Sequence, residues 1–120
     1  MSDTKRTVML ERSLTLEVNG VVHSIAVRIN KPEPDPSSRR DWRCEFSIEG
    51  IPGRASISRE SFGIDSMQAA IMTLQHIRLE LRQLQADGLD IRWLGVKDVG
   101  FPNLSEHEPS VEEWRKKRDR

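Results

Sequence analysis

The chain has 120 residues, enough to bury one hydrophobic core but few for two. Its 19 basic and 19 acidic residues balance, so no overall charge steers it toward nucleic acid, anionic lipid or an acidic substrate. Its first residues lack the apolar stretch typical of a secretory signal, and no stretch approaches the roughly 20 apolar residues that cross a bilayer. We therefore expect a cytoplasmic protein with no membrane association, in which one domain over residues 1–104 precedes a charged tail.

The first predicted element is a β-hairpin around a central Asn-Gly pair, the commonest signal for a two-residue turn. Apolar and polar side chains alternate on both sides of this turn. The implied register pairs Leu14 with Ile25 on one face of the hairpin and Glu11 with Arg28 on the other. Apolar and charged pairs agree on the same register, which strengthens the prediction.

A second hairpin is predicted after a proline-rich segment, residues 31–40, which we expect to be an exposed loop. Alternation over residues 42–49 predicts a strand with one buried face. A return strand from residue 54 would place Ile57 opposite Phe46. Two hairpins give four strands, and residues after Gly88 could add a short fifth.

A long helix is predicted over residues 66–87, because Asp65 can cap its first turn and Gln68 stands three positions later as the reciprocal partner. The apolar spacing predicts a core-facing stripe on this helix, formed by Met67, Ala70, Ile71, Leu74, Ile77, Leu81 and Leu84. The fold class is therefore α+β: a four- or five-stranded antiparallel sheet of two hairpins, with one long amphipathic helix packed on one face. The tail, residues 105–120, could form a short helix.

Residues that could carry chemistry are scattered over this predicted fold. The three histidines and Cys44 have none of the short spacings that zinc sites use. Cys44 lies on the predicted buried face, where cysteine packs as a small apolar side chain. His76 is predicted to point away from the core, beside Glu80 one turn on. We expect no catalytic residue, no metal site and no cofactor.

Three surfaces remain as candidates for function. The first is an apolar pair on the outer side of the helix, seven residues apart, with glutamines around it: Gln68, Met72, Gln75, Leu79 and Gln83. This face either binds a partner or is covered by residues 89–114. The second comprises basic residues that could contact nucleic acid: Arg39, Arg40, Arg115, Lys116, Lys117 and Arg118. The third is a pocket between helix and sheet near Trp42, Asp65 and Trp93.

Three short motifs resemble a known family. They are the Trp-x-Cys of residues 42–44, the Asp-Ser-x-Gln-Ala of residues 65–69 and the Gly-Phe-Pro of residues 100–102. Together they are similar to a family of small, functionally uncharacterised bacterial proteins. The resemblance implies a bacterial origin and supplies no catalytic residue.

The absence of recognisable chemistry favours a non-catalytic protein that binds another protein, either a second copy of itself or a different chain, as accessory or toxin-neutralising proteins do. A nucleic-acid-associated module is the second hypothesis. A small enzyme or ligand carrier that uses the pocket is the third.

Overall fold

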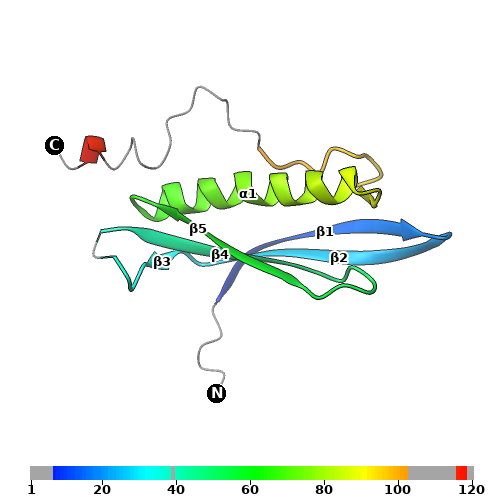
Figure 1. Cartoon of the computed structure of the whole chain (residues 1–120), viewed down its shortest axis with the longest axis horizontal. Helices are drawn as coiled ribbons and strands as arrows, with labels where there is room; N and C mark the ends of the chain where they lie inside the picture. Colours follow the sequence, from blue (N-terminus) through cyan, green and yellow to red (C-terminus); the bar gives the residue numbers. More distant parts are fainter. Residues whose placement is uncertain (1–6, 39, 103–115, 119–120) are drawn as a thin grey trace, which may run out of the picture.

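The computed structural model describes residues 7–38, 40–102 and 116–118, and its core is one antiparallel sheet with a single long helix on one face (Figure 1). This confirms the α+β class with a helix-covered sheet, although the sheet has six strands and not four or five. The elements are β1 (Val8–Val18), β2 (Val21–Asn30), β3 (Glu33–Pro34), β4 (Trp42–Glu49), β5 (Ile57–Gly63), α1 (Ser66–Ala86) and β6 (Asp90–Arg92).

The first hairpin has the predicted register. Leu14 pairs with Ile25 and Glu11 with Arg28, and both central turn residues have the positive φ that an Asn-Gly turn supplies. Arg28 donates to Glu11 at 2.6 Å and also to Glu49 of β4. These two carboxylates raise the pKa of Arg28 above its ordinary value. The outer face of the sheet therefore links three neighbouring strands through one cation.

The sixth strand is β3, within the segment that the prolines predicted to be loop. Glu33 pairs with Arg43 and Pro34 with Trp42. A two-residue strand at the sheet margin tolerates proline because the N–H that proline lacks is not needed there. The ion pair between Arg43 and Glu33, at 2.9 Å, adds a side-chain link.

The predicted register of the second hairpin is wrong by two residues. Phe46 lies opposite Arg59, and Ile57 lies opposite Ile48. The reason is the connection after β4: Gly50 has a φ of 102° and lies so close to β2 that a Cβ there would approach the Ser24 carbonyl oxygen to 2.4 Å. The chain then turns Ile51 into the core, so β5 begins later than a tight turn would allow.

The helix begins and ends where expected, but it is rotated about its axis relative to the prediction. Asp65 accepts from the Gln68 amide at 2.8 Å, and Gln68 accepts in turn from the Ile64 amide. The side chains buried against the sheet are Ala69, Thr73, Ile77, Leu81 and Leu84. Met67 and Ile71, predicted to be core, are 72% and 40% exposed.

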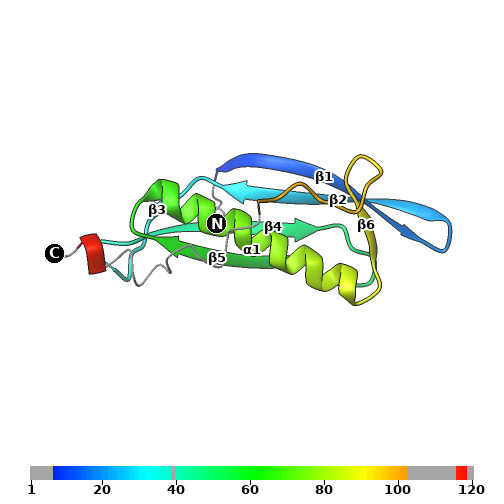
Figure 2. The same ribbon diagram turned by 90° about the horizontal axis from the view of Figure 1, so that it is seen from above.

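Close contact between β5 and the start of α1 explains this rotation. A Cβ on Gly63 would lie 2.4 Å from the amide nitrogen of Ala69, so only small residues fit where the helix meets the sheet. Seen from above, α1 runs along β4 and β5 and leaves the start of β1 to one side (Figure 2). Met67 and Ile71 therefore overhang instead of packing on the sheet.

After α1 the chain adds β6 to the edge of β1, as the expected fifth strand, and then returns between α1 and β1 (Figure 2). Val99 of this return segment is buried in the core. In the tail, residues 116–118 are helical, whereas the rest of the predicted tail helix lies outside the described residues. No helix in the described part of the chain has the length and apolar character needed to cross a bilayer.

Candidate functional site

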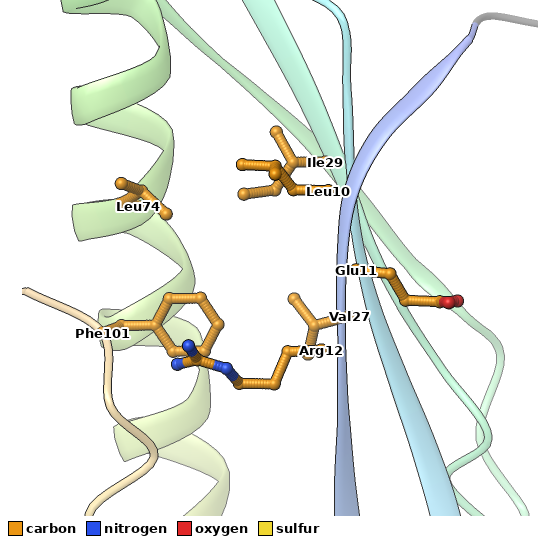
Figure 3. Close-up of a pocket in the computed structure, with 7 residues that line it drawn as sticks. All are labelled: Leu10, Glu11, Arg12, Val27, Ile29, Leu74 and Phe101. Atoms are coloured by element: carbon orange, nitrogen blue, oxygen red, sulfur yellow. The ribbon is translucent and has the colours of Figure 1, made fainter.

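A groove of about 160 Å³ lies between β1 and α1, and we call it the β1–α1 groove (Figure 3). Leu74 and Phe101 form its wall on the helix side, and Val27 and Ile29 of β2 form its floor. The described residues that line it are Leu10, Glu11, Arg12, Val27, Ile29, Leu74 and Phe101. An apolar hollow of this kind with one or two charged groups is typical of a binding site.

Apolar side chains remain exposed on both sides of this groove. Leu10 on β1 is 52% exposed, and Val8 two residues earlier is similarly exposed. On α1, Ile71 and Met67 continue the side of the helix that carries Leu74, at spacings of three and four residues. The groove therefore belongs to a wider apolar surface than its seven lining residues.

Arg12 forms the polar end of the groove. Its guanidinium lies 3.8 Å from the ring centre of Trp93 and 4.8 Å from that of Phe101, a cation–π arrangement on two rings. Its Nη1 donates to the Val99 carbonyl at 3.0 Å. Gly100 permits this packing, since a Cβ there would lie 2.3 Å from the Trp93 ring. We call Arg12, Trp93 and Phe101 the arginine stack.

Beside the groove, one edge of β1 is open. β6 pairs with β1 only at residues 15–17, and within the described residues no strand pairs with residues 10–14 on that side. A bulge between Val8 and Leu10 precedes this regular stretch. Backbone N–H and C=O groups at such an edge can pair with an added strand.

Sequence reasoning missed the groove because Met67, Ile71 and Leu74 were assigned to the core. One signal was available. Arg12 occupies an inward-facing position in a strand whose next inward residues, Leu14 and Leu16, are fully buried. A charged residue in that alternation marks the point where the strand leaves the core.

A second polar cluster joins β5 to α1. Ser61 Oγ lies 3.0 Å from His76 Nδ1, and His76 Nε2 lies 3.5 Å from Glu80, which also binds Arg59 at 2.8 Å. The prediction that His76 points into solvent was wrong, because the rotated helix turns this histidine toward β5 and against Phe46, with ring centres 5.1 Å apart.

This cluster has the order of a nucleophile, a base and an acid, the arrangement that activates a catalytic serine. Ser61 is buried in the middle of a strand, and Arg59 already neutralises Glu80. The arrangement satisfies polar groups along the margin of the core. It was invisible to motif reasoning because its members come from two elements.

The outer helix face, predicted as Gln68, Met72, Gln75, Leu79 and Gln83, is only partly exposed. Leu79 is 53% exposed, whereas Met72 is half-buried. Gln83 donates to Asp87, which ends the helix. Residues 97–101 lie on a different flank of α1, near Arg78 and Arg82. Residues 89–114 were the segment predicted to cover this face as the alternative to a partner. Its residues 89–102 leave Leu79 exposed, and its residues 103–114 lie outside the described residues.

The predicted pocket is not assembled. Trp42 pairs with Gly63 near the start of α1, where Asp65 caps the helix. Trp93 follows β6, beyond the other end of a 21-residue helix about 30 Å long. Trp93 therefore lies toward the opposite end of the helix from Trp42 and Asp65.

The predicted basic surface is partly brought together. Arg118 donates to the Arg40 carbonyl at 2.9 Å and lies 3.3 Å from the Asp41 carboxylate. Lys116 and Lys117 share its helical turn, while Arg39 and Arg115 lie outside the described residues. The carboxylate of Asp41 offsets the charge of Arg118, which weakens this patch as a phosphate site.

Cys44 is buried, and its Sγ donates to the Asn30 carbonyl at 3.4 Å. Burial raises the pKa of this thiol, which disfavours the reactive thiolate. No group of three or more possible metal ligands occurs within the described residues.

The comparisons with known proteins give one match. A family model described as a domain of unknown function, DUF6968, matches residues 10–103. This range includes the β1–α1 groove and the arginine stack. No curated protein and no solved structure matches the chain. Because the family model covers more than half of the sequence, the chain belongs to the DUF6968 family, a domain of unknown function.

Proposed function

We propose that this chain is a non-catalytic protein-binding module that takes an extended segment of a partner protein onto the open edge of β1. The observation that supports this proposal most is that a strand edge with no partner among the described residues coincides with exposed apolar side chains on both sides of the adjacent groove. The proposal keeps the bacterial, cytoplasmic setting and the accessory or toxin-neutralising role expected from the sequence.

Strand addition uses both features of this surface. A segment that pairs with residues 10–14 gains main-chain hydrogen bonds, and alternate side chains enter the neighbouring groove. Leu10, Ile71 and Met67 would then lose contact with water. Each of these side chains contributes roughly 1.5–3 kcal/mol when it is fully buried, so a segment covering part of each can bind measurably.

The β1–α1 groove is a better candidate than the outer helix face. The groove combines a hollow, an open strand edge and exposed apolar residues from two elements. On the outer face, Leu79 is the exposed large apolar side chain, Met72 is half-buried, and Gln68 and Gln83 already bond to neighbouring groups. Because α1 contributes to both surfaces, the same kind of substitution, an exposed apolar residue replaced by glutamate, can test each of them.

The experiment is a selection of short random peptides, displayed with free carboxyl ends, against the immobilised full chain. Selected peptides are then measured against Ile71→Glu, which places a charge on the exposed apolar surface of α1 beside the groove, and against Leu79→Glu, its matched control on the outer face. We expect peptides with alternating apolar residues, weakened about tenfold or more by Ile71→Glu and little changed by Leu79→Glu.

The opposite result, in which Leu79→Glu abolishes binding and Ile71→Glu does not, would transfer the function to the outer helix face. Selection of no peptide that binds the folded protein would reject the module. Sedimentation of the wild type and both variants over a concentration range shows separately whether a second copy occupies either surface. Circular dichroism confirms that each variant is folded.

A further inference from the structure

We infer that the partner segment ends in the groove, with its terminal carboxylate bound by Arg12 and its last side chain, an apolar one, in the β1–α1 groove. The inference rests on the proposed function and adds the chemistry of the partner. It arises from Arg12, the only charged side chain of the described lining that faces this apolar hollow.

Arg12 brings an unneutralised positive charge to the groove. No carboxylate of the described residues lies within ion-pairing distance of its guanidinium. Glu11, although it contributes to the lining, points to the other face of the sheet, where it binds Arg28 (Figure 3). Asp98 accepts from the Gly100 amide. The groove therefore favours an anionic group at this end.

The guanidinium is also held in place before any ligand arrives. Trp93 and Phe101 contact it, and the Val99 carbonyl accepts one of its five N–H groups. The other donors can bind the two oxygens of a carboxylate side by side. A donor that is already ordered loses little conformational entropy when it binds.

The β-sheet itself limits where an added strand can run. Among the described residues, nothing pairs with the outer edge of β1 at residues 10–14, and β6 occupies that edge at residues 15–17. A strand added parallel to β1 therefore has its carboxyl end at the β6 end of this stretch, where Trp93 follows β6 and carries the Arg12 guanidinium on its ring. An antiparallel strand would place its amino end there, and its positive terminus would face the guanidinium. The positive charge of Arg12 thus favours a partner strand that runs parallel to β1 and ends there in its terminal carboxylate.

The size of the groove agrees with a single terminal residue. Its volume of about 160 Å³ is smaller than that of sites for whole cofactors or drug-sized ligands, which measure roughly 300–1,000 Å³. Leu10, Val27, Ile29, Leu74 and Phe101 surround it with apolar surface. A branched apolar side chain next to a carboxylate matches this combination.

The test compares two forms of one peptide, acetyl-Val-Thr-Val-Thr-Leu, with a free carboxyl end and with a terminal amide. Binding to the full chain is measured by titration calorimetry, and the Arg12 side-chain Nε–H signal is followed by NMR. We expect the amide to bind about tenfold or more weakly, because it loses a charge-assisted hydrogen-bonded pair. The Arg12 signal should shift with the acid and little with the amide.

Two variants make the assignment specific. Arg12→Gln should reduce the affinity for the acid to that of the amide, whereas Arg54→Gln, which removes a cation from the exposed loop before β5, should leave both affinities unchanged. If Arg12→Gln disturbs the fold, the NMR comparison on the wild-type chain still decides the question.

Equal affinity for the acid and the amide would overturn the carboxylate assignment while leaving strand addition intact. Binding of octanoate as tight as that of the acid peptide would also overturn it, in favour of a small amphipathic acid. If neither peptide form binds although displayed peptides were selected, the inference alone fails. If no peptide is ever selected and Leu10→Glu lowers the thermal midpoint sharply, the groove is covered by the chain itself, and both proposals fail.

Discussion

At the scale of single residues, alternation predicted burial well where neighbours along the strand decide it. Leu14, Cys44 and Phe46 are buried because every second side chain of a half-covered strand faces the core. The role of Arg12 could not be predicted in this way. Its stacking and hydrogen-bonding partners stand more than 80 positions later in the chain, with the Val99 carbonyl 87 residues away.

Cys44 should be almost unreactive in the folded protein. It is buried under α1, and desolvation raises the pKa of its thiol. At neutral pH we expect iodoacetamide to modify it only as fast as the protein unfolds, with the rate followed by mass spectrometry. The same chain in urea is the control and should react as a free thiol does. Modification of the folded chain at that control rate would contradict the buried position.

The same shift predicts how stability depends on pH. Because the thiol pKa is higher in the folded than in the unfolded chain, the unfolded chain loses this proton first as pH rises. The contribution of Cys44 to stability is therefore complete below the ordinary thiol pKa and is lost above it. Urea unfolding of Cys44→Ala at neutral and alkaline pH provides the comparison, and it should lack this part of the alkaline decline.

At the scale of elements, local sequence signals predicted which strands and helix form better than they predicted how these elements pair and pack. The Asn-Gly turn fixed the first hairpin because the two turn residues determine its register. The second register was wrong since Gly50 and Ile51 form a long connection shaped by contact with β2. The helix began at Asp65 as its cap predicted, yet its buried side was set by Gly63, a residue outside the helix.

Substitution of Gly63 by alanine should therefore destabilise the packing of β5 on α1. The added Cβ would meet backbone atoms of Gln68 and Ala69, which cannot move aside as a flexible side chain would. We expect a loss of about 3 kcal/mol in the free energy of unfolding, measured with urea. Gly53→Ala is the control: its Cβ meets nothing, and the left-handed backbone conformation costs an alanine about 1–2 kcal/mol.

An equal loss for the two glycine variants would mean that backbone conformation, and not the close approach of β5 to α1, determines the effect. A smaller loss for Gly63→Ala would show that α1 can shift on the sheet. Such a shift should then change the exposure of Met67 and Ile71, because these side chains overhang as a result of the present contact.

At the scale of the whole molecule, the order of the strands determines where the surface opens. The path β4–β2–β1–β6, with β5 on the other side of β4, places α1 over β4 and β5 and leaves β1 at the far side of the sheet. Local pattern does not contain this order, because the pairing of β2 with β4 joins two hairpins that are separate in sequence. The candidate site at β1 follows from that pairing.

Amide hydrogen exchange should report this open edge directly. In the free protein, alternate amides of residues 10–14 lack a described strand partner on their outer side, whereas residues 26–29 of β2 and 46–48 of β4 have a paired strand on both sides. We expect these alternate β1 amides to exchange fast and the β2 and β4 amides slowly, when measured by NMR. A peptide that adds as a strand should slow the fast set.

Protection confined to alternate residues distinguishes strand addition from other modes of binding. A ligand that only fills the groove would contact Leu10 and Phe101 without supplying main-chain partners, so the fast β1 amides would stay fast. Uniform slowing across all strands would instead indicate general stabilisation of the fold by bound ligand. Protection of alternate β1 amides that is lost with Ile71→Glu and kept with Leu79→Glu would show that one ligand contacts both the open edge of β1 and the side of α1.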